Sequence, residues 1–322
     1  MRRTARRPIA WPAGMAPIPT PLPSPPGRDA RLTQFDYVVV TWTVEEAKCL
    51  ADTLTPGHDS QTDWYDYARN FEQDFVPLIR KGAPALESKR LGSWFPTRIA
   101  NKPVACFKFD LHMSQDGPKL PVAKLWQQVI AETRPKFIIT TGTAGGIGPV
   151  MELGDTVIAS QVRFDCLHEF KNAPFHASIF ACPRVSTANQ STATQHCKAN
   201  AGHLPLASRS PKIFTAPAAG VSPLDVVTTD FFAFDDSNND YGRQGLGAAV
   251  EMGDAVLGMV IEKMGSGAPR WATVRNASDP QIDAKGLTLK EAGIKAAQIY
   301  ERLGYLTTIS SAIACWALVV DN

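Results

Sequence analysis

The chain has 322 residues, 44% of them hydrophobic, which is enough apolar material for one large domain or two small ones. Its formal net charge is +2, and the positive charge lies in the first 30 residues, where five arginines accompany one aspartate. The remainder is close to neutral. This argues against an extended nucleic-acid-binding surface, because such surfaces depend on clustered lysine and arginine.

Residues 1–33 are predicted to form a disordered, partly extended arm. Eight prolines fall between Pro8 and Pro26, in a stretch with little periodic apolar character. Prolines also interrupt every apolar core that a secretory signal would need after its arginines. An organelle transit peptide is the alternative for this arm, which is rich in arginine and poor in acidic residues. Residues 34–322 are expected to form a single domain.

The strand and helix patterns that follow this arm predict an α/β fold. Predicted strands lie at residues 37–41, 104–110, 137–141, 156–160, 226–229 and 271–274, and predicted helices at residues 44–50, 124–132, 249–264 and from 290 to the end. Residues 56–98 and 166–220 are predicted to be irregular elaborations that line the mouth of a pocket. Alternating strands and helices indicate a three-layer sandwich, with a central twisted mixed β-sheet flanked by helices.

A glycine-rich run follows the predicted strand at residues 137–141. Residues 142–148 read Gly-Thr-Ala-Gly-Gly-Ile-Gly, and this composition predicts a turn where backbone N–H groups approach a ligand. The third glycine of a dinucleotide fingerprint is missing after Gly148, and no Gly-Lys-Ser/Thr follows. The run is therefore no standard nucleotide-phosphate cradle. A tight turn without a ligand is the other interpretation.

The late apolar stretch Ile309–Val320 is too short for a membrane span of roughly 20 residues and suits a buried terminal helix.

The six cysteines contain no CxxC pair, which is typical of reduced thiols in a cytosolic protein. The spacings of cysteine and histidine at residues 166–203 match no common zinc site. No metal, no membrane association and a cytoplasmic location are therefore expected.

Several segments together resemble the nucleoside phosphorylase/nucleosidase superfamily, and most closely its methylthioadenosine/S-adenosylhomocysteine nucleosidases. They are Glu45-Glu46 after the first strand, the run from Thr141 to Ile147 with Gly154-Asp155, Asp230-Phe231-Phe232, Val250-Glu251-Met252, and Arg275-Asn276-Ala277-Ser278-Asp279. The resemblance covers about residues 36–310, and it is carried by the order and spacing of the segments rather than by one motif.

The resemblance implies an enzyme that cleaves the N-glycosidic bond of a purine nucleoside or thionucleoside without a cofactor. Bond cleavage needs an acid to protonate the departing base and a nucleophile at the anomeric carbon. Asp279 falls at the position of the family's acid, with Ser278 orienting it. The alternative for Asp279 is a turn, since it precedes Pro280. Thr141, Thr143, Ala144, Gly145 and Gly146 would form the floor of the sugar site.

The sequence favours water over phosphate as the nucleophile. The resembling phosphorylases carry a Gly-Asp-Pro after the first strand and an arginine before the glycine run, since a phosphate dianion needs fixed positive charge. Here the first strand ends in Trp42-Thr43, and Thr140-Thr141 precede the glycines. Glu46 falls where the nucleosidases carry the glutamate that activates water. An exposed carboxylate stabilised at a helix start is the alternative for Glu46.

One position departs from the family. The nucleosidases read Glu-Met-Glu, and the last glutamate holds the ribose hydroxyls, but this chain reads Glu251-Met252-Gly253-Asp254. Glu251 or Asp254 would have to substitute, and Asp254 is rotated by about 100° on a helix. Met252 is expected beneath the sugar, with plain core packing as the alternative. Phe232 is the best-placed aromatic platform for the base, and Phe175 and Phe180 are further candidates.

Three functions follow from these residues. The leading prediction is a hydrolytic nucleosidase that acts on a small nucleoside substrate and forms a homo-oligomer. The first alternative is a phosphorylase, with phosphate held by Arg98, by Arg163 or by a neighbouring subunit. The second is a non-catalytic nucleoside-binding protein of the same fold, which Gly253 favours. Fold alone does not separate the three.

Overall fold

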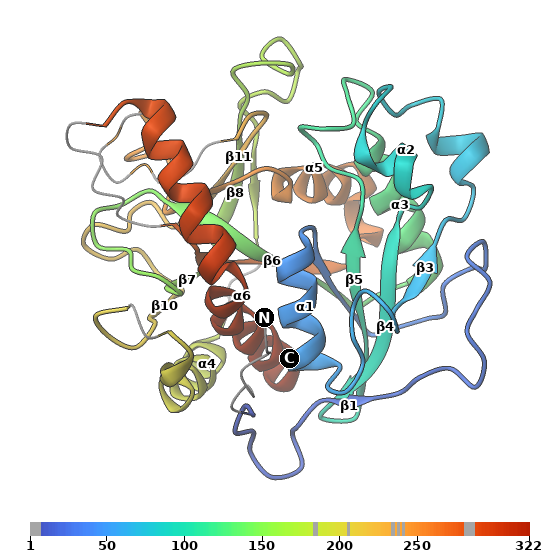
Figure 1. Ribbon diagram of the computed structural model, residues 1–322, viewed down its shortest axis with the longest axis horizontal. Helices are drawn as coiled ribbons and strands as arrows, with labels where there is room; N and C mark the ends of the chain where they lie inside the picture. The colour runs from blue at the N-terminus through green and yellow to red at the C-terminus, as the bar shows by residue number, and fades with distance from the viewer. Residues whose placement is uncertain are drawn as a thin grey trace.

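A mixed β-sheet runs through the centre of the computed structural model (Figure 1). The structure describes residues 8–182, 186–204, 207–232, 236, 239, 242–279 and 287–322. The strands are β1 (Ile18–Pro19), β2 (Tyr37–Thr41), β3 (Tyr65–Tyr67), β4 (Gly92–Ile99), β5 (Lys102–Phe109), β6 (Phe137–Gly146), β7 (Thr156–Ile158), β8 (Gln161–Asp165), β9 (Ile179–Ala181), β10 (Ile213–Phe214), β11 (Asp225–Thr229), β12 (Ala249–Glu251) and β13 (Arg270–Ala277).

Within the described residues, the strands lie in the order β1-β4-β5-β2-β6-β12-β11-β8-β9, and β13 pairs with both β6 and β7. Strand β2 pairs in parallel with β5 and β6, and β6 pairs in parallel with β13. Strands β4 and β5 are antiparallel, as are β12 and β6. The predicted mixed sheet is confirmed.

Helices cover both faces of the sheet. They are α1 (Val44–Leu54), α2 (Pro84–Ser88), α3 (Pro121–Thr133), α4 (Thr187–Ala199), α5 (Asp254–Met264) and α6 (Leu289–Asp321). Neighbouring residues of a strand point to opposite faces: Val39 packs in one cluster with Leu50 of α1 and Trp316 of α6, and Val38 in the other with Trp126 of α3. This gives the predicted three layers, with α1, α4 and α6 on one side and α3 and α5 on the other.

Most of the glycine-rich run, Gly142 to Gly146, is strand, and the chain turns only at residues 148–150. Strand β6 continues to Gly146, pairing in parallel with β13 as far as Ala144 and antiparallel with β12 at Gly145 and Gly146. Backbone pairing on both sides holds these small residues extended, which the prediction of a turn at residues 142–148 missed. The long strand β6 thereby belongs to both halves of the sheet and places its carboxyl end among β12 and β13.

The predicted helix at residues 249–264 is also divided. Ala249–Glu251 form strand β12, and α5 begins only at Asp254, after the N-cap residue Gly253. The side chain of Glu251 turns back and accepts hydrogen bonds from the backbone N–H groups of Gly253 and Asp254, at 2.6 and 3.0 Å. A buried carboxylate at a helix start satisfies N–H groups that the helix itself leaves unpaired.

Residues 8–33 lie along the domain instead of forming the predicted disordered arm. Strand β1 pairs with β4, Trp11 packs at 4.7 Å between ring centroids on Trp316, and the Trp316 indole donates a hydrogen bond to the carbonyl of Met15. Prolines favour an extended backbone, and the apolar residues between them find places on the domain, as with Leu32, which is buried. Residues 1–7 lie outside the described residues.

Two regions predicted to be irregular contain regular elements. Strand β3 and all but the last residue of β4 lie within residues 56–98, and α4 lies within residues 166–220. Helix α4 is weakly apolar, and its start is fixed by a capping box in which Ser186 and Asn189 bond each other's backbone N–H groups.

The terminal helix agrees with the helix predicted from residue 290 to the end of the chain. Helix α6 spans Leu289–Asp321, and its length and composition would suffice to cross a membrane, but 83% of its most apolar window is buried inside the protein. It contacts α1, α4 and β6, and Trp316 and Ile313 are fully buried. Residues Ile309–Val320 therefore form the predicted buried terminal helix.

Candidate active site

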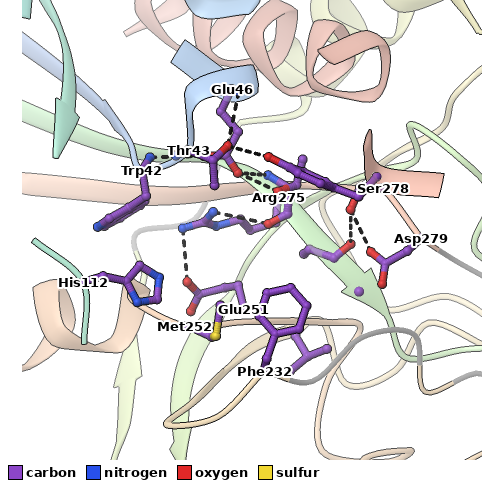
Figure 2. A pocket seen from close by; sticks show the side chains of 15 residues that line it. Trp42, Thr43, Glu46, His112, Phe232, Glu251, Met252, Arg275, Ser278 and Asp279 are labelled. Carbon is purple, nitrogen blue, oxygen red and sulfur yellow. Dashed lines mark hydrogen bonds and ion pairs between the residues drawn. The ribbon is translucent and has the colours of Figure 1, made fainter. Parts of the chain in front are cut away.

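A pocket opens where the carboxyl ends of β6 and β13 meet β12 and the start of α1 (Figure 2). Its empty volume, including the mouth, is about 700 Å³, within the range of small-molecule sites. The lining residues are Trp42, Thr43, Glu46, His112, Thr143, Ala144, Gly145, Phe232, Val250, Glu251, Met252, Arg275, Ser278, Asp279 and Tyr300. The segments that carry the family resemblance thus converge on one cavity, from positions far apart in the sequence.

Glu46 is held rigidly at one wall of the pocket. It is the third residue of α1 and forms a capping box with Thr43, whose side chain accepts a hydrogen bond from the Glu46 backbone N–H. Its Oε2 accepts from Thr41 Oγ1 at 2.6 Å and from the backbone N–H groups of Trp42 and Thr43. Its Oε1 accepts from the backbone N–H and the hydroxyl of Thr143, at 2.8 and 2.6 Å.

These contacts keep Glu46 ionised although it is only 2% exposed. Burial alone would raise the pKa of this carboxyl, but the Arg275 guanidinium and the hydrogen bonds from Thr143 and Thr41 outweigh it and lower the pKa below its usual value. The sequence alternative of an exposed helix-start carboxylate is therefore wrong. Glu46 caps the helix and also faces the pocket.

Arg275 is the central cation of the pocket. Its guanidinium donates to Asp254 through Nε at 2.8 Å and Nη2 at 2.5 Å, and Nη2 also lies 3.2 Å from Glu251 Oε2. The indole of Trp42 stacks on it, with the guanidinium carbon 5.0 Å from the ring centroid. Two carboxylates therefore share one guanidinium in a buried site.

This sharing affects the proton affinity of Glu251. Burial, followed by the neighbouring charge of Asp254, raises the pKa of Glu251 to about 7, against the lowering effect of Arg275. Glu251 accepts from Thr228 Oγ1, the backbone N–H groups of Gly253 and Asp254, and Arg275. Its four acceptor positions are thus occupied by the protein itself.

Ser278 and Asp279 lie directly after β13, on the opposite side of the pocket from Trp42 and His112 (Figure 2). The Ser278 backbone N–H donates to the Ala144 carbonyl at 3.0 Å, which joins the end of β13 to β6. The Ser278 hydroxyl donates to Asp279 Oδ1 at 2.7 Å. Ser278 is therefore placed to orient Asp279, as the sequence predicts, and Asp279 faces the pocket although it is mostly buried.

Nine of the twelve predicted site residues line the pocket, and three do not. Thr141 is buried in β6, and Gly146 is also buried and pairs with β12. Asp254 lies behind the wall, fully buried against Arg275, so the prediction that it contacts a sugar directly is not supported by its position.

Of the three aromatic candidates for the base platform, Phe232 alone lines the pocket, and its side chain is 59% exposed. Phe175 and Phe180 pack on Phe164 in the core between sheet and helices, with ring centroids 4.8 and 6.0 Å from it. Asp230, which precedes the Phe231-Phe232 pair, accepts backbone hydrogen bonds from the loop at residues 167–170 and supports the fold there.

Sequence reasoning missed six lining residues, Trp42, Thr43, His112, Val250, Arg275 and Tyr300. Arg275 stands inside the segment that carries the resemblance, and a cation beside predicted acids was a usable signal for it. His112 follows β5 and Tyr300 belongs to α6, where it donates a hydrogen bond to Thr43 Oγ1 at 2.8 Å. Only the topology brings these two residues to the pocket, so no local pattern identifies them.

The cationic residues expected to hold phosphate in a phosphorylase lie elsewhere. Arg98 is on β4 and donates to the Asn101 carbonyl, and Arg163 on β8 lies 3.7 Å from Asp225. No described residue of the elaborations at 56–98 and 166–220 lines the pocket, contrary to the prediction for its mouth. Among the described residues, no group of three histidine, cysteine or acidic side chains is arranged to hold a metal ion.

The chain is similar in fold to solved nucleosidases. The 5′-methylthioadenosine/S-adenosylhomocysteine nucleosidase of Helicobacter pylori, solved with butyl-thio-DADMe-Immucillin-A, is 15% identical at a TM-score of 0.54, covering 90% of this chain and 99% of that one. Futalosine hydrolase of Helicobacter pylori is 15% identical at a TM-score of 0.53, covering 89% and 97%. The corresponding nucleosidase of Neisseria meningitidis, in complex with methylthio-immucillin-A, is 16% identical at 0.51, covering 88% and 97%.

At these identities the structural neighbours establish the fold, and they agree with the three-layer architecture. A comparison with curated protein sequences finds no match. The model of the phosphorylase superfamily matches residues 118–303, which is more than half of the chain and includes β6, β12, α5 and β13. The chain therefore belongs to the phosphorylase superfamily.

Proposed function

We propose that this protein hydrolyses the N-glycosidic bond of a purine nucleoside or thionucleoside. The observation that carries the proposal is the placement of Asp279 and Glu46 on the same pocket, each with a fixed orientation. A nucleoside in this pocket would lie between the two carboxyl groups. The solved nucleosidases of the same fold bind nucleoside analogues, which supports the same class of ligand here.

Asp279 is proposed to act as the general acid. Departure of the base leaves negative charge on the purine, and protonation of the base at N7 removes this charge in the transition state. The hydrogen bond from Ser278 to Oδ1 fixes the orientation of the Asp279 carboxyl group. The exposed ring of Phe232, which lines the same pocket, supplies an apolar surface for the purine (Figure 2).

Glu46 is proposed to serve the sugar side of the reaction. An ionised carboxylate stabilises the positive charge that develops on the sugar ring, and it orients a water molecule toward the anomeric carbon. Its lowered pKa makes Glu46 a weak base, but an oxocarbenium-like sugar is a strong electrophile and needs only a positioned water. The Thr143 hydroxyl, which donates to Glu46 Oε1 and lines the pocket, links this carboxylate to the floor.

Hydrolysis is proposed over phosphorolysis because of the charge at the pocket. Arg275 is the one lysine or arginine among the described lining residues, and Asp254 and Glu251 already bind it. Glu46, whose pKa is lowered, adds a further negative charge near Arg275. A phosphate dianion placed there would meet carboxylates rather than free cations.

The test is a panel of nucleosides incubated with and without phosphate, with the products separated by chromatography. Wild type, Asp279→Asn and Glu46→Gln are compared. We expect release of free base and free sugar in phosphate-free buffer, with both variants strongly impaired. Base release that requires phosphate and yields a sugar 1-phosphate would instead identify a phosphorylase, and tight binding without turnover a nucleoside-binding protein.

We further propose a cytoplasmic homo-oligomer. All six cysteines are buried and free of disulfides, which is typical of a reducing compartment. Light scattering of the purified protein gives its oligomeric state.

A further inference from the structure

The sugar end of the pocket lies opposite Asp279. Figure 2 shows Asp279 on one side, Trp42 and His112 on the other, and Arg275 and Phe232 between them. If Asp279 protonates the base, as the proposed function has it, the sugar extends toward Trp42 and His112. This placement, which rests on the proposed function, brings the hydroxyl groups of the sugar to the residues at that end.

Glu251 has no acceptor position left for a sugar hydroxyl, because it accepts four hydrogen bonds from the protein. Glu46 is the carboxylate that the proposed function assigns to the attacking water. Asp254 binds Arg275 through both oxygens and does not line the pocket. A hydroxyl that donates its proton to Glu251 would have to displace an existing partner.

Trp42 takes the space where a side chain of residue 253 would extend. A Cβ placed on Gly253 would lie 3.3 Å from Trp42 Cζ2, 3.4 Å from Cε2 and 3.6 Å from Glu251 Oε2. The indole is only 9% exposed and packs on Arg275 and Phe109. Tryptophan and glycine therefore form a complementary pair, in which an apolar ring replaces the carboxylate that the resembling nucleosidases carry after Met252.

His112 offers this end a donor rather than an acceptor. Its Nδ1 accepts from the Ser114 backbone N–H at 3.3 Å and lies 2.9 Å from Ser114 Oγ, so the ring proton belongs on Nε2. Burial lowers the pKa of His112 to about 4, so the imidazole is neutral near pH 7. The ring lines the pocket and brings one N–H group without positive charge.

A ribose ring carries two neighbouring hydroxyls, each with a proton to donate. The sugar end provides N–H donors from His112 and from Trp42, whose Nε1 has no hydrogen-bond partner among the described residues, together with an indole surface and the Met252 thioether, but no unoccupied oxygen of Glu251. From this mismatch we propose that the substrate is a deoxynucleoside, in which one of the two ring hydroxyls is absent. The remaining hydroxyl accepts the hydrogen bond from His112 Nε2, and the deoxygenated edge of the sugar faces Trp42.

Binding measurements test this proposal apart from turnover. Calorimetry on Asp279→Asn compares adenosine with 2′-deoxyadenosine and 3′-deoxyadenosine, which share one base and differ in a single hydroxyl. We expect one of the deoxynucleosides to bind at least tenfold more tightly than adenosine, because a buried unpaired hydroxyl weakens binding by about that factor or more. Equal or tighter binding of adenosine would overturn the proposal. The two deoxynucleosides identify which hydroxyl is excluded.

The wild-type enzyme and a paired variant complete the test. If wild type releases adenine from none of the three nucleosides, the proposed function fails, while the ratio of dissociation constants still decides the sugar preference. Trp42→Leu/Gly253→Glu opens the space and restores a carboxylate, and Trp42→Leu alone is its control. The ratio of the dissociation constants of adenosine and the preferred deoxynucleoside should be at least fivefold smaller in the double variant than in the Trp42→Leu control. An unchanged ratio in a folded double variant would show that the Trp42–Gly253 pair does not select the sugar.

Discussion

The Glu46 carboxylate lies directly against the backbone of Gly142. A Cβ on residue 142 would be 2.5 Å from Glu46 Oε1 and 2.9 Å from Arg275 Nη1, and Gly142 has a φ of +144°. Glycine is therefore required here because two functional side chains meet over its α-carbon. The glycine in strand β6 leaves space for the side chains of Glu46 and Arg275. The same strand also supplies the Thr143 N–H group that donates to Glu46.

Gly142→Ala should therefore impair both stability and activity. The added methyl group overlaps Glu46 and requires a backbone conformation unfavourable for alanine, so we expect a loss of about 3 kcal/mol or more in the free energy of unfolding. Urea denaturation measures this loss. Gly57→Ala is the matched control, since Gly57 also has a positive φ, of +88°, but no atom within 4 Å of a Cβ. A loss of about 1 kcal/mol is expected there, and equal losses in the two variants would contradict the crowding at Gly142.

Asp279→Asn should lower kcat by about 10²–10⁴-fold on an ordinary purine nucleoside, because the amide cannot protonate the leaving base. A nucleoside methylated at N7 carries a positive charge on the base already and needs no acid. Steady-state kinetics on guanosine and 7-methylguanosine separate the two cases. If Asp279 is the acid, the variant loses less than tenfold on the methylated substrate. The same loss on both would assign Asp279 to binding or folding instead.

Arg275→Gln should destabilise the protein by about 3–5 kcal/mol, because it leaves the buried carboxylates of Asp254 and Glu251 without their shared guanidinium. Chemical denaturation near pH 7.5 gives the free energy. Arg163→Gln removes an ion pair of longer distance, 3.7 Å, whose arginine is 21% exposed, and should cost about 0–1 kcal/mol. A small change in the free energy of unfolding of Arg275→Gln would mean that Asp254 and Glu251 are not both ionised in the native protein.

The raised pKa of Glu251 predicts how stability depends on pH. Between the usual glutamate range near 4.5 and about 7, the native state holds a proton that the unfolded state has released. Stability therefore falls as the pH rises through this window, by at most about 1.4 kcal/mol per pH unit, and levels off above it. Unfolding free energies of wild type minus those of Glu251→Gln, from pH 5 to 8, isolate this contribution. A difference that rises or stays constant with pH would refute the raised pKa.

Much of the fold could be predicted from the sequence because its elements are marked locally. Strand β2 is a continuous apolar run, and α1 follows a Thr43-x-x-Glu46 pattern that the structure turns into a capping box. The extension of β6 through its glycines could not be predicted, since it depends on pairing with β12 and β13 from more than 100 residues away. Pairing with β12 and β13 keeps these glycines extended, although their composition locally favours a turn.

The site was predictable to the extent that its residues stand in contiguous segments. Ser278 and Asp279 follow one strand and lie together for that reason, whereas His112 and Tyr300 reach the pocket only through the topology. Asp254, the first residue of α5, lies behind the pocket wall because Arg275 of β13 binds both of its oxygens there. An ion pair between residues of two different elements cannot be predicted from the local pattern of a single sequence.

The most direct test of the account is the product analysis of a purified sample in phosphate-free buffer. Wild type incubated with 2′-deoxy-, 3′-deoxy- and ribonucleosides of purines should release free base together with free sugar, and added phosphate should neither speed the reaction nor yield a sugar 1-phosphate. Absence of base release from every nucleoside, or release that depends on phosphate, would contradict the assignment of a hydrolytic nucleosidase.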